Sequence, residues 1–314
     1  MYQFIIRRLL LMIPVLIGVS GIVFVLMRVI PGDIAELLAG DYASEELLEQ
    51  IRQELGLNKP IHHQYAEWLW GACRLDFGKS MWSGEPVLSE IARRFPLTLQ
   101  LALMTTAITV VIAIPVGVIC AIRQDSVWDY VLRVFAISGL SMPSFWIGIL
   151  IIMALVAAFR WVPPLGYVNI WEDAPKNMQI LIWPAIAVGF RQAAIQARMS
   201  RSCMLEVLRQ DYIRTGWAKG LSEKIVVIRH ALKNAVLPVI TIIGVEFAFL
   251  FGGLVVTEVV FTLPGVGRYL VDAIHQRDYT VIQAIVLIMA VIVSFANLVV
   301  DIIYGWLDPR VRYQ

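Results

Sequence analysis

The chain has 314 residues, of which 59% are hydrophobic and only 16% are charged, and its formal net charge is +2. Soluble domains carry roughly 25% charged residues, so this composition excludes an ordinary soluble protein, and so small a net charge does not indicate nucleic-acid binding. The charged residues collect in blocks between long apolar runs. This pattern is typical of a membrane protein that crosses the bilayer several times.

Six apolar runs are long enough to cross a bilayer as helices, which takes about 20 residues for a hydrocarbon core of ~30 Å. The expected spans are residues 9–30, 97–122, 132–159, 180–199, 236–261 and 282–304. The first run is longer than the core of a signal peptide and no small-residue cleavage site follows it, so residues 1–30 are interpreted as an uncleaved first span. Pro115, Pro143 and Pro184 lie inside spans and are expected to kink or break them.

Residues 31–95 are predicted to form a small external helical cap between the first two spans. In "SEELLEQIRQELGL" the apolar residues recur at helical spacing and Ser44 is suited to cap the first turn. "YAEWLWGACRLDFG" predicts a second short amphipathic helix, whose tryptophans favour the membrane interface. His62 and His63 are adjacent, so their side chains point in different directions, and we interpret them as surface residues and not as metal ligands.

The distribution of Lys and Arg predicts that both termini are cytoplasmic. With this orientation, 15 of the 26 basic residues lie in inner segments and only four lie in the two short outer loops. The remaining seven lie in the first outer segment, which exceeds the ~60-residue limit within which the positive-inside rule applies. The predicted organisation is therefore a first span, the cap, a five-helix core at 96–307 with a cytoplasmic loop at about 200–235, and a cytoplasmic tail at 308–314.

One stretch of that cytoplasmic loop, "DYIRTGWAKGLSEKIVVIRHALKNAVLP", is polar and basic between two apolar spans. Its first part predicts a short helix that ends at Gly220, a residue suited to the left-handed conformation of a helix end. The second part predicts another helix that starts at Ser222, before a sharp turn into the membrane at Pro238. We call residues 211–236 the elbow. It has the shape to fit a groove on a soluble partner, and a basic loop attracted to anionic lipid is the alternative that the residues leave open.

The sequence contains no motif that indicates catalysis. A phosphate-binding loop, H-E-x-x-H, G-x-S-x-G and C-x-x-C are all absent, and "LPGVGRYL" is interpreted as an external turn. We therefore predict neither catalytic residues, nor a metal site, nor an enzyme. Glu246 lies near the middle of the fifth span, where an ionisable group is costly, so it is a candidate for a translocation path. A structural hydrogen bond to a neighbouring helix is the alternative.

The elbow resembles the EAA loop of the inner-membrane permease subunits of ABC importers, in particular the dipeptide/oligopeptide/nickel branch. Gly220 matches the motif glycine, and Arg214, Thr215 and Gly216 match the three preceding positions. Arg214 replaces the acidic residue that names the motif, as is common in this branch, and Gly216 replaces the usual alanine. The resemblance covers nearly the whole chain, through "RRLLLMIPVLIGVSGIVFVLMRVIPGD", "FPLTLQLAL", "SMPSFWIGILII", "VVTEVVFTLPGVGRYLVDAIHQRDYTVIQA" and "NLVVDIIYGWLDPRVRY".

This resemblance implies an all-α polytopic protein of the bacterial inner membrane, with six transmembrane helices and the type I ABC importer permease fold. It implies a second homologous permease subunit, two ATPase subunits that bind ATP and Mg²⁺, and an external substrate-binding protein, while the chain itself binds no cofactor. The residues that it assigns to ATPase coupling are Asp211, Tyr212, Arg214, Thr215, Gly216, Gly220 and Leu221.

Di- and oligopeptides are the cargo that the resemblance favours, and nickel complexes, glutathione or oligosaccharides are alternatives within the same branch. A self-sufficient ion-coupled carrier that uses Glu246 is an alternative from another class. Such a carrier is favoured by inverted repeats or by several acidic groups in the middle of the membrane, and the sequence shows neither.

Overall fold

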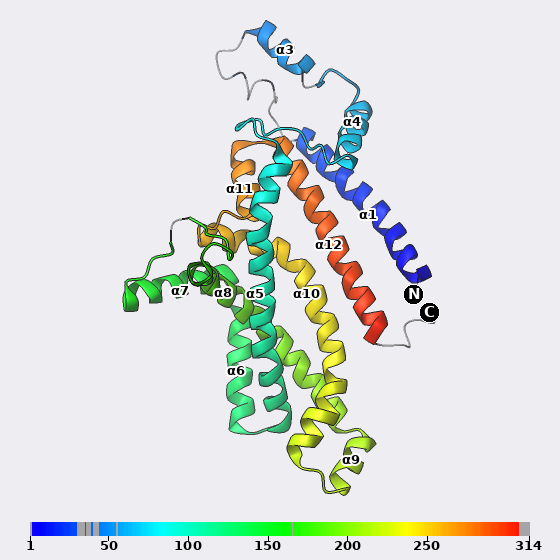
Figure 1. Cartoon of the computed structure of the whole chain (residues 1–314), viewed down its shortest axis with the longest axis vertical. Helices are drawn as coiled ribbons and strands as arrows, with labels where there is room; N and C mark the ends of the chain where they lie inside the picture. Colours follow the sequence, from blue (N-terminus) through cyan, green and yellow to red (C-terminus); the bar gives the residue numbers. More distant parts are fainter. Residues whose placement is uncertain are drawn as a thin grey trace. The chain divides into compact units, whose positions relative to one another are not determined.

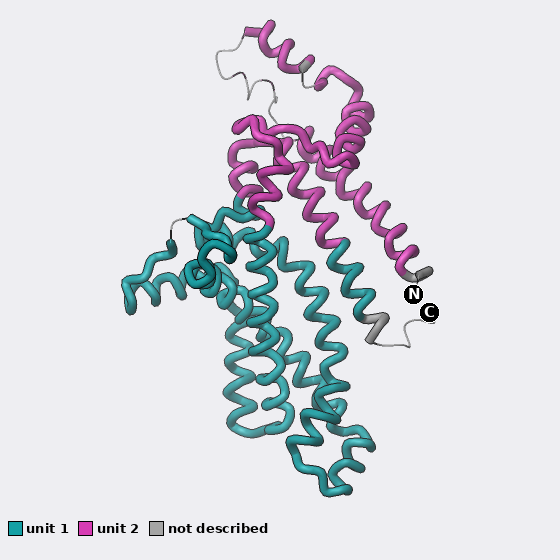
Figure 2. Tube along the Cα trace, viewed as in Figure 1, with its two compact units in different colours: residues 1, 96–268, 295–314 teal, residues 2–95, 269–294 magenta. Residues whose placement is uncertain are grey.

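The structure is a computed structural model, and it describes residues 2–29, 35, 39, 44–54, 56–164 and 166–307. Two compact units make up the chain (Figure 2). Unit 1 contains Pro96–Arg268 and the residues from Phe295 onward, and unit 2 contains Tyr2–Phe95 and Tyr269–Ser294. The predicted tail at 308–314, and residues 31–34, 36–38, 40–43 and 55 of the predicted cap, lie outside the described residues.

Helices form almost all of the regular structure in the described residues, with one isolated bridge between Lys79 and Pro86. In chain order (Figure 1) they are α1 (Tyr2–Val29), α3 (Glu45–Glu54), α4 (Ile61–Cys73), α5 (Val87–Ile122), α6 (Val127–Ser141), α7 (Ser144–Phe159), α8 (Ala174–Leu208), α9 (Asp211–Ala218), the π-helix η1 (Ile225–Leu232), α10 (Lys233–Val260), α11 (Val266–Gln276) and α12 (Tyr279–Leu307).

Among the described residues, five helical segments are long and apolar enough to span a membrane: α1, α5, α8, η1 joined to α10, and α12. The helices α6 and α7 are a candidate for a sixth span only as a pair, and they are bent by 105° at the break between them. The break lies at Pro143, as expected, because a proline pushes the preceding residue out of the helical region. Met142 is accordingly extended, with φ −103° and ψ 132°. The predicted all-helical membrane fold is confirmed, with five candidate spans in the described residues and six if the bent pair is counted as one.

The other prolines do not interrupt their helices. Pro115 lies inside α5 and Pro184 inside α8. The expected sharp turn at Pro238 is wrong, since α10 continues through this residue. A proline removes one helical hydrogen bond, whereas ending the helix in hydrocarbon would leave several N–H and C=O groups without partners. The second elbow helix does follow Ser222, but it starts as the π-helix η1 and runs directly into α10.

In unit 1, α8 packs against α6, α7 and α10. Small residues let α5 approach α8 closely. A Cβ atom added at Gly117 would lie 2.5 Å from Ser200 Cβ, and one added at Gly189 would lie 3.0 Å from Ile108 Cγ2. Such small residues are typical of helix pairs in membranes, where close backbone approach replaces the hydrophobic driving force. The α8 helix therefore supports most of unit 1.

In unit 2, the external segment is tied to the helices on both sides of it. Both predicted cap helices are present as α3 and α4, and Leu47 N–H donates to Ser44 Oγ at 3.3 Å, as a helix cap does. The Ser20 and Tyr65 hydroxyls of α1 and α4 lie 2.8 Å apart. Asp278, before α12, accepts hydrogen bonds from Ser80 Oγ and the Met81 N–H. These contacts hold the cap on the ends of two spans.

Candidate functional site

The elbow begins with the short helix α9, and a glycine closes its end. Gly220 has a φ of +76°, in the left-handed region that glycine adopts without a Cβ clash. The Leu221 N–H donates to Gly216 O at 3.3 Å, and the Gly220 N–H donates to Trp217 O at 2.9 Å. These two bonds form a Schellman motif, which satisfies carbonyls at the helix end. The predicted left-handed helix end at Gly220 is confirmed.

An apolar core fixes the elbow on the helices around it. Ile213 of α9 is fully buried, in one cluster with Met204 of α8, Val226 of η1 and Ala121 of α5. The partly buried Leu221 packs on the same cluster. Gly216 lies over this core, where an added Cβ would be 3.8 Å from both the Leu221 and Val226 side chains. The elbow is therefore a packed part of unit 1 and not a loose loop (Figure 1).

The other side chains of α9 are largely open to solvent. Tyr212 and Trp217 are 44% and 46% exposed, and Asn234 donates to the Tyr212 hydroxyl at 2.8 Å. Asp211 and Arg214 form an exposed ion pair at 3.5 Å, and Thr215 is also exposed. Exposed aromatic residues on a rigid helix are typical of protein-binding surfaces. The residues predicted for coupling thus include four exposed residues of α9, whereas Gly216 and Leu221 pack toward the elbow core.

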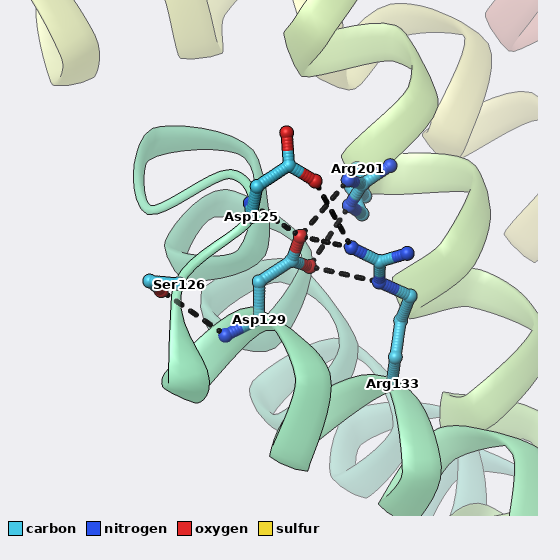
Figure 3. Close-up of polar contacts among 5 residues, drawn as sticks. All are labelled: Asp125, Ser126, Asp129, Arg133 and Arg201. Atoms are coloured by element: carbon cyan, nitrogen blue, oxygen red, sulfur yellow. Dashed lines mark hydrogen bonds and ion pairs between the residues drawn. The ribbon is translucent and has the colours of Figure 1, made fainter.

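A cluster of charged residues joins α6 to α8 (Figure 3). The Asp129 carboxylate is fully buried and pairs with the guanidinium groups of Arg133 and Arg201. Arg201 donates through Nε and Nη2 at 3.1 Å each, and the Asp125 N–H donates to Asp129 Oδ2 at 3.1 Å. Ser126 caps α6 by accepting from the Asp129 N–H. A buried carboxylate needs this number of partners to offset its lost hydration.

This charged cluster adjoins the elbow core along α8. Arg201 lies just before Cys203 and Met204, which are part of that core. Sequence reasoning did not single out any of its residues. The spacing of Asp129 and Arg133 is a readable helical i,i+4 pair. Nothing in the sequence indicates Arg201 as their third member, because it lies 72 residues beyond Asp129.

A second buried carboxylate lies at the end of α10. Glu258 is fully buried, and it accepts hydrogen bonds from Thr98 Oγ1 at 2.7 Å and from the Arg268 N–H at 3.0 Å. A Cβ atom added at Gly265 would lie 2.3 Å from this carboxylate, and one added at Gly267 would lie 3.0 Å from it. The interpretation of "LPGVGRYL" as a turn holds only for Leu263–Gly265, because α11 begins at Val266. The glycines of this segment make room for Glu258.

Glu246 lies in α10 and is partly buried. It makes no hydrogen bond or ion pair with any residue that the structure describes, so the proposed structural hydrogen bond to a neighbouring helix is not found there. Its place on a translocation path stays a prediction.

The described residues include no group of three His, Cys, Asp or Glu side chains that could hold a metal ion. The His62 and His63 rings lie 4.5 Å apart and make a tilted ring contact. A metal would need further ligands at this pair.

These features define a polytopic helical membrane protein with a rigid, exposed elbow between two of its spans. The fold is similar to a chain in the solved structure titled "Crystal structure of an amino acid ABC transporter with histidines", with a TM-score of 0.51 and 14% sequence identity over 71% of this chain and 94% of that chain. At this identity the similarity shows the fold alone.

The chain belongs to the family of binding-protein-dependent transport system inner membrane components, which it matches over residues 113–313. The N-terminal component of the same family matches residues 1–102. A putative peptide transport system permease protein of Brucella abortus is 43% identical over 314 residues. The glutathione transport system permease protein GsiC of Escherichia coli is 40% identical over 314 residues. Both alignments cover 100% of each chain. The protein is therefore a multi-pass component of the inner membrane.

Proposed function

We propose that this chain is the permease subunit of an ATP-driven importer and forms half of the transmembrane path for di- and oligopeptides. An external binding protein delivers the cargo, and a second homologous permease subunit forms the other half of the path. The geometry of the elbow is the observation that carries this proposal. The helix α9 presents exposed aromatic residues, and its buried Ile213 anchors it to the neighbouring helices. The relatives named as peptide and glutathione permeases support the class of cargo.

In this proposal the elbow transmits movement and performs no chemistry. ATP and Mg²⁺ bind to two partner ATPase subunits, which contact exposed side chains of α9, among them Tyr212, Arg214 and Trp217. Because α9 packs on α8 and on η1, which continues into α10, a displacement of α9 moves these spans as well. Such coupling needs two states of the whole assembly that ATP binding biases, with a rigid connection between them.

Glutathione is the second candidate cargo, and the 40% identity to GsiC favours it. The two candidates share a chemistry, since both are short peptides with free carboxylates. A nickel complex or an oligosaccharide has no such support among the relatives named above. The self-sufficient carrier centred on Glu246 stays the alternative from a different class, because this carboxylate is unpaired within the described residues.

Copurification from the native membrane tests the proposal. The tagged chain is extracted in a mild detergent, and every retained partner is identified by its intact mass. We expect a second permease of similar length together with ATPase subunits. Recovery of the chain alone, still active in transport after reconstitution without ATP, would show that it is a self-sufficient carrier.

A Trp217→Ala variant sharpens this experiment. The side chain is 46% exposed and is not part of the elbow core, so its removal is expected to leave the fold intact and to reduce ATPase recovery. Trp171→Ala is the matched control, since Trp171 is 87% exposed in an external loop of the predicted topology. The control is expected to retain the ATPases.

A further inference from the structure

Unit 2 contains a mixed polar and aromatic pocket at the outer end of α1. Its volume is about 240 Å³. The residues that matter here are Phe24 and Arg28 of α1, Gln64 and Trp68 of α4, and Tyr279 and Gln283 of α12. The orientation predicted from Lys and Arg places this pocket on the external side. It lies in a different unit from the elbow, and the proposed ATPase coupling does not use it.

Arg28 is held in a defined position at this pocket. Its Nε and Nη2 donate to Gln64 Oε1 at 3.1 Å and 2.7 Å, and its guanidinium lies 3.5 Å from the centre of the Phe24 ring. Gln64 in turn donates through Nε2 to the carbonyl oxygens of Leu57 and Lys59. These two bonds fix which end of the Gln64 amide faces Arg28. The guanidinium is therefore oriented before any ligand arrives.

The charge of Arg28 is not balanced within the described part of the chain. Its partners there are an amide oxygen, a backbone carbonyl and an aromatic ring. The acidic residue that lines the pocket, Glu67, has both carboxylate oxygens 2.8 Å from Lys59 Nζ. A partly buried cation that has only neutral partners favours binding of an anion, since a carboxylate matches the fork of a guanidinium.

Two further donors at the pocket lack partners. Tyr279 and Gln283 are 5% and 6% exposed, and the Tyr279 hydroxyl and Gln283 Nε2 have no hydrogen-bond partner among the described residues. Unsatisfied buried polar groups are uncommon and require an explanation. Together with Arg28 they make the pocket rich in donors and poor in free acceptors.

The other walls of the pocket are apolar or aromatic and include Phe24, Trp68, Met27 and Met81. Pockets for drug-sized ligands have volumes of roughly 300–1,000 Å³. The pocket in unit 2, at about 240 Å³, therefore suits a smaller group. We propose that it binds a carboxylate carried on an apolar group, the chemistry of the C-terminal residue of a short peptide, with Arg28 as the carboxylate contact. The choice of a peptide rests on the proposed function.

Equilibrium binding of a labelled dipeptide tests this proposal. The full chain, with the subunits that it retains, is placed in nanodiscs without ATP and without the external binding protein. The probes are alanyl-phenylalanine and its C-terminal amide, which differ in the carboxylate alone. We expect saturable binding of the acid and at least about tenfold weaker binding of the amide, as for loss of one charge-assisted pair.

Two variants localise the effect. Arg28→Gln removes the cation, and Gln64→Glu leaves Arg28 in place but supplies an internal carboxylate that competes with the ligand. Both are expected to weaken binding of the acid by about tenfold or more. Arg74→Gln is the matched control, because Arg74 also lies over an aromatic ring, at 4.6 Å from the centre of the Trp70 ring, and does not line the pocket. It is expected to bind the acid as the unchanged protein does.

Equal binding of the acid and the amide would overturn the proposal. Unchanged binding in Gln64→Glu, or absence of saturable binding of the acid at millimolar concentration, would also overturn it. Because ATP is left out, none of these results bears on the importer function, and loss of ATPase copurification would not affect the pocket.

Discussion

Gly220 in the elbow and Gly265 in the turn between α10 and α11 are both glycines beside a helix end, but they meet different physical needs. Gly220 has a positive φ and open space around its Cα, with no atom within 4 Å of an added Cβ. Gly265 has the Glu258 carboxylate 2.3 Å from such a Cβ. A substitution at Gly220 therefore tests backbone conformation, whereas one at Gly265 tests the space around a buried charge.

The two regions also differ in what anchors them. The elbow is held by apolar burial of Ile213 and presents its outer face to solvent. The turn is held by hydrogen bonds to Glu258, which is fully buried. A surface that must bind a moving partner can be exposed on one side as long as its apolar anchor is intact. A buried carboxylate depends on every one of its partners.

The largest loss of stability is expected for Gly265→Ala. The added methyl group would occupy the position of the Glu258 carboxylate and separate it from Thr98 and from the Arg268 N–H. We expect the free energy of unfolding to fall by about 3 kcal/mol, the range for hydrogen bonds to a buried charged group. Thermal unfolding of the purified chain in detergent measures this loss.

A double variant isolates the steric cause. In a Glu258→Ala background the methyl group at Gly265 meets no carboxylate, so Gly265→Ala is expected to cost less than about 0.5 kcal/mol there. Additive losses in the two variants would show that Gly265 is needed for some other reason.

A smaller loss is expected for Asp129→Asn, which tests the ionic support of α8 next to the elbow. Arg133 and Arg201 would both lose a charged partner, but their side chains are 39% and 20% exposed, so water compensates in part. We expect a loss of about 2 kcal/mol. Asp125→Asn is the control, because its carboxylate is 67% exposed and 3.8 Å from Arg133, and its loss should stay within about 0.5 kcal/mol. Equal losses in both variants would contradict the role given to Asp129.

The apolar anchor of the elbow is tested by Ile213→Ala. Removing a fully buried isoleucine side chain costs about 2 kcal/mol or more in stability. Because the elbow packs through this residue, transport per ATP is expected to fall as well. Tyr212→Ala, on the exposed face of the same helix, should stay within about 0.5 kcal/mol of the unchanged protein in thermal unfolding. A large loss in Tyr212→Ala would show that the outer face also supports the fold.

The smallest loss of stability, and the clearest loss of function, is expected for Gly220→Val. A β-branched residue at positive φ costs about 1–2 kcal/mol locally, and the elbow is expected to change its angle without loss of membrane insertion. Transport per ATP in proteoliposomes, measured with the partner subunits present, should fall.

Two controls separate strain from coupling. Asparagine tolerates the left-handed region, so Gly220→Asn should retain most of the transport. Gly84→Val places the same strain in the external segment, where φ is +71° and an added Cβ also meets nothing within 4 Å. It should leave transport per ATP unchanged. If Gly220→Val behaved like Gly84→Val, the elbow would have no mechanical role.

The sequence predicted the elements that depend on neighbouring residues. Apolar runs indicated the spans, because each helix must satisfy its own backbone in hydrocarbon. Ser44 and Gly220 marked a helix start and a helix end through local hydrogen bonds. The turn expected at Pro238 was wrong, because the tendency of one proline to break a helix is weaker than the need of a long apolar helix to keep its bonds.

By itself, then, the sequence determined the helical class, the spans, the family and the capped elbow. Each of these depends on residues that lie close together in the chain. Only the tertiary structure decided which distant residues meet. It brought Arg201 to Asp129, Thr98 to Glu258 and Gln64 to Arg28. The partners in these pairs lie 36 to 160 residues apart, so no local sequence pattern connects them. The free energy of burying a charge depends on the presence of such partners.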